Sequence, residues 1–224
     1  MINFLEYSDR EVLVSQVTQT LASDLSSSIE ERRNVIFSVP GGSTPGPIFD
    51  KICEFDLDWK RVSILLNDER WVPENSERSN TKLLRERLLI KNASDATYIS
   101  MFCDASTPEL GIPKLQQQIE SKLPISVLLF GMGEDMHTAS LFPGGDNLDK
   151  ALSSEAPTLL PMRADGASEA RVTLTAPVLN SSRIKHLVIF GKEKRSAFEK
   201  AMSLPSKLAP ISAILPGASV HWAA

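Results

Sequence analysis

The chain has 224 residues, which at roughly 150 residues per domain suits one large domain or two small ones, and we expect a single domain over 1–224. Hydrophobic residues make up 42% and charged residues 23%, enough to form a core, so disordered, collagen-like and coiled-coil classes are disfavoured. The net charge of -4 gives no overall positive field for nucleic acid or an anionic membrane. An anionic ligand must therefore find a local basic pocket.

The longest apolar stretches, such as 125–131, fall far short of the roughly 20 residues that span a bilayer. The opening residues 1–10 carry charges where a secretory signal is apolar, so we expect a cytoplasmic protein without a membrane partner. Cys53 and Cys103 are far apart and form no C-x-x-C motif, which predicts two small buried side chains rather than a redox or zinc site.

The first predicted element is a helix over 10–31, because apolar residues recur there at spacings of three and four. A β-branched run at 35–39 then predicts a strand, and Pro-Gly-Gly ends it before a helix over 45–55. The same alternation continues along the chain. It predicts strands at 62–66, 97–102, 125–130, 171–175, 186–190 and 218–222, and helices at 80–89, 108–123 and 192–202.

Strands that are apolar throughout and separated by helices are typical of an α/β protein whose sheet is covered on both faces. We therefore predict one doubly wound, mainly parallel sheet flanked by helices, with 143–168 as a long excursion within the domain. In such sheets ligands bind beyond the carboxyl ends of the strands. The loops after Val39, Leu66, Phe130 and Phe190 are therefore the places to search for a site.

Three familiar signatures are excluded by single positions. The glycine step from 41 to 46 has Pro47 and Ile48 where a nucleotide-binding P-loop requires Lys and Ser or Thr. The segment 131–136 lacks the third glycine of a dinucleotide fingerprint. No serine lies in a G-x-S-x-G elbow, and the three histidines lack the spacing of metal ligands, so we expect no metal.

The first loop runs from Gly41 and Gly42 through Ser43 and Thr44 to Pro45. Thr44 is suited to the N-cap and Pro45 to the first helical position, which leaves free backbone N–H groups at a positive helix end. That arrangement binds phosphate, although a tight, well-capped turn has the same sequence.

The second loop contains Asp68, Glu69 and Arg70. Arg70 has the planar charged fork that grips phosphate oxygens, and the two acids would hold it in place. A solvated corner with salt bridges is the structural alternative.

The third loop contains Gly131 and Gly133, whose backbone can approach a ligand closely, and then Asp135 and His137. We predict His137 in the first turn of a short helix ended by Pro143, where the dipole favours the neutral imidazole that a general base needs. Asp135 and a bound phosphate would act in the opposite direction. A histidine hydrogen-bonded within a core turn is the alternative.

The fourth loop places Lys194 at the start of a helix. A cation there opposes the helix dipole unless an anion lies between them, which favours Lys194 as an anion ligand. Arg171, which opens a predicted strand, is a further candidate for the same pocket.

Taken together, these motifs resemble the 6-phosphogluconolactonases, a family in the same superfamily as glucosamine-6-phosphate deaminase. The resemblance covers most of the chain and is carried by VPGGSTP, LLNDERWVP, LLFGMGEDMHTASLFPG, RVTLTAPVLN and VIFGKEK. The HTASLFP block is the specific one. Met136 stands where the family usually has glycine, and a positive φ there would strain the turn beside His137.

The resemblance implies a sugar-phosphate isomerase type of fold and hydrolysis of 6-phospho-D-glucono-1,5-lactone to 6-phospho-D-gluconate in the oxidative pentose phosphate pathway, without a cofactor. His137 would activate water, and Asp135 and Asp68 would assist, Asp68 by orienting a sugar hydroxyl or Arg70. The substrate would be bound by Gly41, Gly42, Ser43, Thr44, Arg70, Gly131, Gly133, Arg171 and Lys194. The expected partner is this small lactone, and the expected assembly is a monomer or homodimer.

Two alternatives belong to the same superfamily. A deaminase of this type carries a glutamate five residues beyond the histidine, where this chain has Phe142, and an aromatic residue where it has Arg70. A non-catalytic sugar-phosphate sensor usually carries a DNA-binding helix-turn-helix, for which 1–31 leaves no room.

Overall fold

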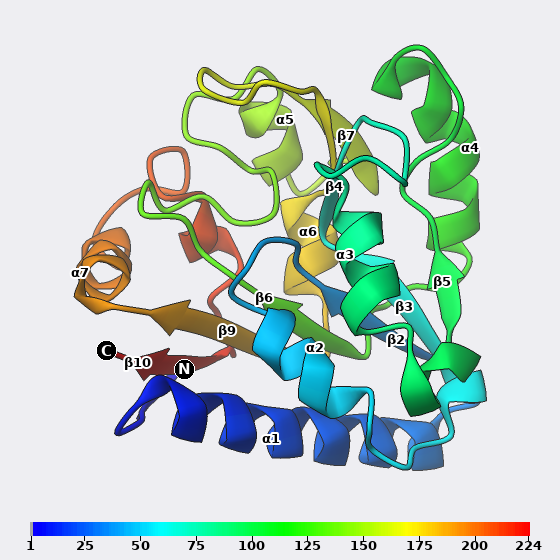
Figure 1. Ribbon diagram of the computed structural model, residues 1–224. Coiled ribbons are helices and arrows are strands. Elements are labelled where there is room, and N and C mark those ends of the chain that lie inside the picture. The colour runs from blue at the N-terminus through cyan, green and yellow to red at the C-terminus, as the bar shows by residue number, and fades with distance from the viewer. Residues whose placement is uncertain (1) are drawn as a thin grey trace.

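A computed structural model describes residues 2–224 and shows a seven-stranded sheet at its centre (Figure 1). The strand order is β1-β10-β9-β6-β2-β3-β5, and every neighbouring pair is parallel. The strands are β1 (Asn3–Glu6), β2 (Val35–Val39), β3 (Val62–Leu66), β5 (Thr97–Ile99), β6 (Val127–Phe130), β9 (Ile184–Phe190) and β10 (Ser219–Ala223). The predicted α/β fold with a mainly parallel sheet is confirmed.

Helices flank this sheet, with α1 running beneath it and α6 above it in the view of Figure 1. The helices are α1 (Arg10–Glu31), α2 (Gly46–Ile52), α3 (Asn80–Arg87), α4 (Pro108–Glu120), α5 (Leu148–Leu152), α6 (Ala176–Asn180) and α7 (Lys192–Ala201). Three short 3₁₀ segments cover Trp59–Arg61, Lys91–Asp95 and Pro210–Ala213. Among the helices of residues 2–224, none is both long and apolar enough to cross a membrane.

The first helix shows why the local pattern was readable. Asp9 caps α1 by accepting a hydrogen bond from the backbone N of Val12 at 2.8 Å, and α1 ends at Glu31 as predicted. Its buried residues recur at the predicted spacing of three and four, and they include Val17 and Leu21, both fully buried. Of the two cysteines, Cys53 is buried as expected, whereas Cys103 is only partly buried.

A second sheet of three antiparallel strands was not predicted. It has the order β4-β8-β7, formed by β4 (Asp68–Arg70), β7 (Leu159–Met162) and β8 (Arg171–Leu174). The strand predicted at 171–175 therefore pairs outside the main sheet, and the excursion over 143–168 contributes α5 and β7. This sheet lies beyond the carboxyl end of β3, because β4 follows β3 after a single residue (Figure 1).

Candidate active site

A cavity of about 380 Å³ opens at the carboxyl ends of the central strands. The loops after Val39, Leu66, Phe130 and Phe190 all contribute to its lining, as expected for a doubly wound sheet. The structure brings together in this lining eleven of the residues singled out from the sequence: Gly41, Gly42, Ser43, Thr44, Asp68, Arg70, Gly131, Gly133, His137, Arg171 and Lys194. Asp135 is the remaining one, and it reaches the cavity only through its contact with His137.

The glycine loop requires the absence of side chains at two positions. Gly42 has a φ of 85°, and a Cβ on Gly41 would lie 2.0 Å from the side-chain oxygen of Asn80. The prediction that Thr44 caps the next helix and Pro45 begins it is wrong, because Pro45 is the N-cap residue and α2 begins at Gly46. The backbone N of Gly46 donates to the carbonyl of Ser43 at 3.3 Å and closes a turn there. The loop is therefore one residue longer than predicted.

The two acids of β4 do not pair with the Arg70 guanidinium, contrary to the prediction. Side chains alternate along a strand, so Asp68 and Arg70 share one side and Glu69 lies on the other. Asp68 accepts a hydrogen bond from the hydroxyl of Ser140. Glu69 is fully buried and accepts from the backbone N of Arg70 at 2.7 Å and of Asn80 at 2.8 Å, so it ties β4 to the first turn of α3.

Arg70 and Arg171 lie directly opposite each other in the β4–β8 pair. Both Nε atoms are buried without a hydrogen-bond partner in the part of the chain that the structure describes. The Arg70 guanidinium donates to the backbone carbonyl of Arg78 at 2.5 Å, and Arg171 approaches Glu169 only to 3.9 Å. Burial, and next the charge of Arg70, lower the pKa of Arg171. Two opposed cations with unused donors are the surroundings that an anion would complete.

His137 lies in an irregular turn and not in the predicted helix. The backbone N of Gly133 donates to the carbonyl of His137 at 3.0 Å, and Met136 and Ala139 on either side have φ values of 68° and 49°. Two left-handed residues interrupt any right-handed helix, so no helix dipole acts on His137. A positive φ favours glycine, so Met136 adopts the strained conformation considered from the sequence, and His137 nevertheless lines the cavity.

The His137 ring is held from three sides. Asp135 Oδ1 lies 2.5 Å from its Nδ1, and the ring of Phe142 packs at 4.8 Å between centroids. A Cβ on Gly133 would lie 2.3 Å from the ring, so only glycine fits there. The contact with His137 lowers the pKa of the Asp135 carboxyl, which stays ionised. Because Nδ1 is occupied, Nε2 is the nitrogen that a ligand in the cavity would meet.

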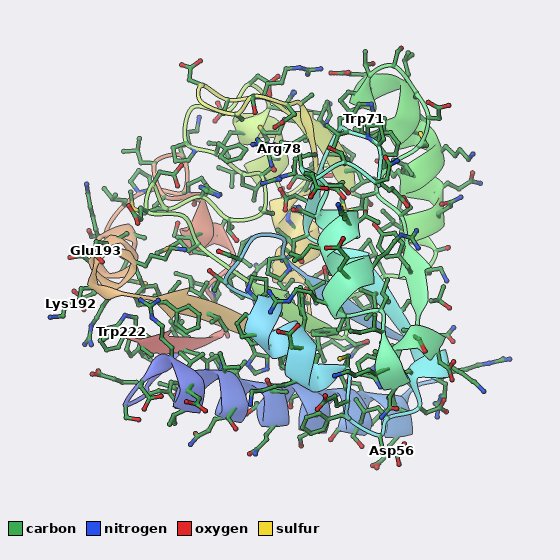
Figure 2. The ribbon with its side chains drawn as sticks, in the orientation of Figure 1. Asp56, Trp71, Arg78, Lys192, Glu193 and Trp222 are labelled. Atoms are coloured by element: carbon green, nitrogen blue, oxygen red, sulfur yellow. The ribbon has the colours of Figure 1, made fainter. Side chains whose placement is uncertain are left out.

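Lys194 lies in the first turn of α7 and lines the cavity from the side of β9. Burial lowers its pKa, and the charge of Glu134 opposes that shift. The neighbouring Lys192 and Glu193 are exposed and lie on the outer side of α7 (Figure 2). Of this charged run, Lys194 is thus the residue that faces the cavity.

Eleven further residues line the cavity and were not predicted as site residues, among them Asn80, Met132, Thr138 and Phe142. Asn80 and Phe142 belong to sequence motifs that were noted, but an asparagine and a phenylalanine do not by themselves indicate a ligand-binding role. Thr138 lines the wall while its hydroxyl donates to the carbonyl of Gly131 at 2.8 Å. Within residues 2–224 no group of three His, Cys, Asp or Glu side chains is arranged to hold a metal ion.

Comparison with known proteins agrees with this geometry. The family model described as glucosamine-6-phosphate isomerases/6-phosphogluconolactonase matches residues 8–222. The 6-phosphogluconolactonase of Pseudomonas aeruginosa is 34% identical over 206 residues, which cover 90% of this chain and 87% of that protein. That of Rhizobium meliloti is 34% identical over 220 residues, covering 93% and 95%.

A solved structure shows the same similarity in three dimensions. The crystal structure of a 6-phosphogluconolactonase from Shewanella baltica has a TM-score of 0.96 and 31% identity to this chain, and the match covers 100% of this chain and 98% of that one. Sequence, architecture and the lining of the cavity lead to one assignment. The chain belongs to the glucosamine-6-phosphate isomerase/6-phosphogluconolactonase family.

Proposed function

We propose that this protein hydrolyses 6-phospho-D-glucono-1,5-lactone to 6-phospho-D-gluconate in the oxidative pentose phosphate pathway. The observation that carries the proposal is one cavity with an imidazole–carboxylate pair, His137 and Asp135, together with the cations Arg70, Arg171 and Lys194. Such a cavity suits an anionic substrate with a group open to attack by water. The relatives that share the fold and a third of the sequence are named for this activity.

Hydrolysis begins with water held between His137 Nε2 and the lactone carbonyl carbon. As the water oxygen bonds to that carbon, His137 takes its proton and Asp135 stabilises the resulting imidazolium. Negative charge moves to the carbonyl oxygen, and we propose that the backbone N–H of Gly131, which lines the cavity, stabilises it; the N–H of Gly133 is already bonded to the His137 carbonyl. The bond from the carbonyl carbon to the ring oxygen then breaks, and the proton on His137 passes to that oxygen. The product is an open-chain acid with a new hydroxyl group.

The cations bind the phosphate end of the substrate. Arg70 and Arg171 supply guanidinium donors from the small sheet, and Lys194 supplies an ammonium from α7. Ser43 and Thr44 complete the grip from the glycine loop. Binding both ends holds the lactone carbon beside His137, which is how orientation contributes to the rate.

Asp68 is proposed to orient the sugar. One of its carboxylate oxygens accepts from the Ser140 hydroxyl, which leaves the other for a substrate hydroxyl. Of the two roles considered from the sequence, this one agrees with the lack of an ion pair between Asp68 and Arg70 among the described residues.

The test uses purified protein and freshly generated lactone, with acid release followed at constant pH. We expect release well above the spontaneous rate, and a much smaller effect on unphosphorylated gluconolactone. Release of ammonia from glucosamine 6-phosphate would instead indicate a deaminase, which Phe142 at the position of the deaminase glutamate argues against. Binding of 6-phosphogluconate without any hydrolysis would indicate a sensor.

We propose that residues 1–224 act as one domain in the cytoplasm. We also propose that the protein is a monomer or a homodimer, and sedimentation of the purified chain would decide between these two states. We also propose that no cofactor takes part, so activity should survive dialysis against a strong chelator. Loss of activity that zinc or magnesium restores would contradict this.

A further inference from the structure

Asn67 occupies the single position between β3 and β4 and is 1% exposed. Its backbone N–H donates to the carbonyl of Val39 at 2.9 Å, at the end of β2. Its backbone carbonyl accepts from the N–H of Leu174 at 3.0 Å, at the end of β8. The main chain of Asn67 therefore joins the central sheet to the small sheet.

The side chain of Asn67 makes two further links. Its Oδ1 accepts from the hydroxyl of Ser38 on β2 at 2.7 Å, and its Nδ2 donates to the carbonyl of Leu129 on β6 at 2.9 Å. The Leu129 carbonyl can only accept, so the amide orientation is fixed. All three residues are buried, so each bond lies in surroundings where an unmade bond is costly.

These links lie where the pairing between β2 and β6 ends, at the carboxyl ends of the two strands. The pairing of the two strands consists of Phe37 with Val127 and Ser38 with Leu128. The strand order reverses here, since the chain builds outward from β2 through β3 on one side and from β6 through β9 on the other. The glycine loop starts just past Ser38, and the loop of His137 starts just past Leu129. Asn67 thus bridges the two strand ends from which the two halves of the site emerge.

We infer that Asn67 is a positioning residue that sets the separation between the glycine loop at 41–44 and the His137 loop at 131–137. The inference rests on the proposed function, in which one substrate touches both loops. Breaking the link to β6 moves His137 relative to the lactone carbon and leaves the phosphate grip in place. A displacement of about 1 Å can reduce a rate by roughly 10²-fold, so the effect should appear in kcat rather than in KM.

The variant Asn67→Asp tests this with almost no change of shape. When ionised, the new carboxylate keeps an acceptor for the Ser38 hydroxyl but loses the donor and turns an anionic oxygen towards the Leu129 carbonyl, so the kinetics are measured at a pH high enough to ionise a buried acid. We expect kcat to fall at least about tenfold while KM stays within about twofold of the parent value. A purely structural role would lower the melting temperature without separating kcat from KM.

Ser126→Ala is the matched control. The Ser126 hydroxyl accepts from the backbone N of Ile36 at 3.2 Å, so it also links β2 and β6, but at their amino ends, away from the cavity. We expect a loss of stability there and unchanged kcat and KM. If Asn67→Asp does not fold, Ser38→Ala replaces it, since it removes the hydroxyl that holds the Asn67 amide, and kcat should fall several-fold with KM retained.

The outcomes separate the two proposals. A folded Asn67→Asp or Ser38→Ala variant with the parent kcat would overturn the role of Asn67, as would an equal fall of kcat in Ser126→Ala. A parent protein that does not hydrolyse the lactone refutes the proposed function itself. An active parent with a fall of kcat confined to the Asn67 link supports both.

Discussion

Replacing Arg171 by methionine should weaken binding of the phosphorylated ligand without destabilising the empty protein. In the empty site Arg171 opposes Arg70 across the β4–β8 pair, and its Nε is buried without a partner in the described chain. Opposed like charges cost roughly 0.2–1 kcal/mol, and an unsatisfied buried donor roughly 1–3 kcal/mol. Methionine keeps the apolar stem and removes both costs, at the loss of a 3.9 Å contact with Glu169.

The free energy of unfolding of the empty Arg171→Met variant should therefore match or exceed that of the parent. A gain of about 1 kcal/mol would raise the melting temperature by roughly 2–4 °C in a chain of this size. The phosphate, in contrast, loses a charge-assisted hydrogen bond of about 1.5–3 kcal/mol. The dissociation constant for 6-phosphogluconate, and KM with it, should rise roughly 10- to 150-fold.

Thermal unfolding with and without 6-phosphogluconate measures both effects together. At a ligand concentration of 100 parent dissociation constants, the parent gains about 2.7 kcal/mol, whereas a variant that binds tenfold more weakly gains about 1.4 kcal/mol. Arg78→Met is the control, because Arg78 forms an ion pair with Glu169 at 2.9 Å, as a neighbour of the same acid that Arg171 approaches, and is absent from the cavity lining. If Arg171→Met melts several degrees lower when empty and keeps the full response to ligand, Arg171 is a structural cation and not an anion ligand.

Three further predictions concern the histidines and Lys194. His137→Ala should lower kcat roughly 10²- to 10⁴-fold and leave the calorimetric affinity for 6-phosphogluconate nearly unchanged; undiminished turnover would exclude His137 as the base. Burial lowers the pKa of Lys194 in the unliganded protein, so as the pH rises Lys194 should lose its charge before an ordinary lysine would. Binding of 6-phosphogluconate should therefore weaken as the pH approaches the ordinary lysine pKa, and Lys194→Arg should keep its binding up to a higher pH. Burial, and next His186, lower the pKa of His221 to about 3, so the unfolded chain binds the extra proton between about pH 6.5 and 3. The free energy of unfolding should be fully retained above pH 6.5 and decrease as the pH falls towards 3, and urea unfolding of His221→Gln should show a shallower decrease; equal slopes would contradict this.

The order of the main elements and the loops that form the cavity follow from local sequence patterns. The helix at 10–31 was predictable because its cap and its buried stripe are local, each set by residues within a turn or two. The buried parallel strand at 35–39 is apolar at every position except Ser38, and such an apolar run is also a local property. Once the alternation was known, the general rule for strand ends placed the glycine loop, the DER segment and the His137 and Lys194 loops at one edge.

How these residues face one another could not be predicted in this way and is set by the assembled fold. Arg70 meets Arg171 through antiparallel pairing between segments about a hundred residues apart, and no periodicity encodes that register. The left-handed turn at Met136 is held in part by the backbone N of Ile211, which donates to its carbonyl at 3.1 Å from the other end of the chain. The sequence pattern favoured a helix at His137 because it weighs near neighbours only. Turn geometry, the partners of buried acids and the links made by Asn67 depend on contacts between distant segments, and these exist only once the sheets have assembled.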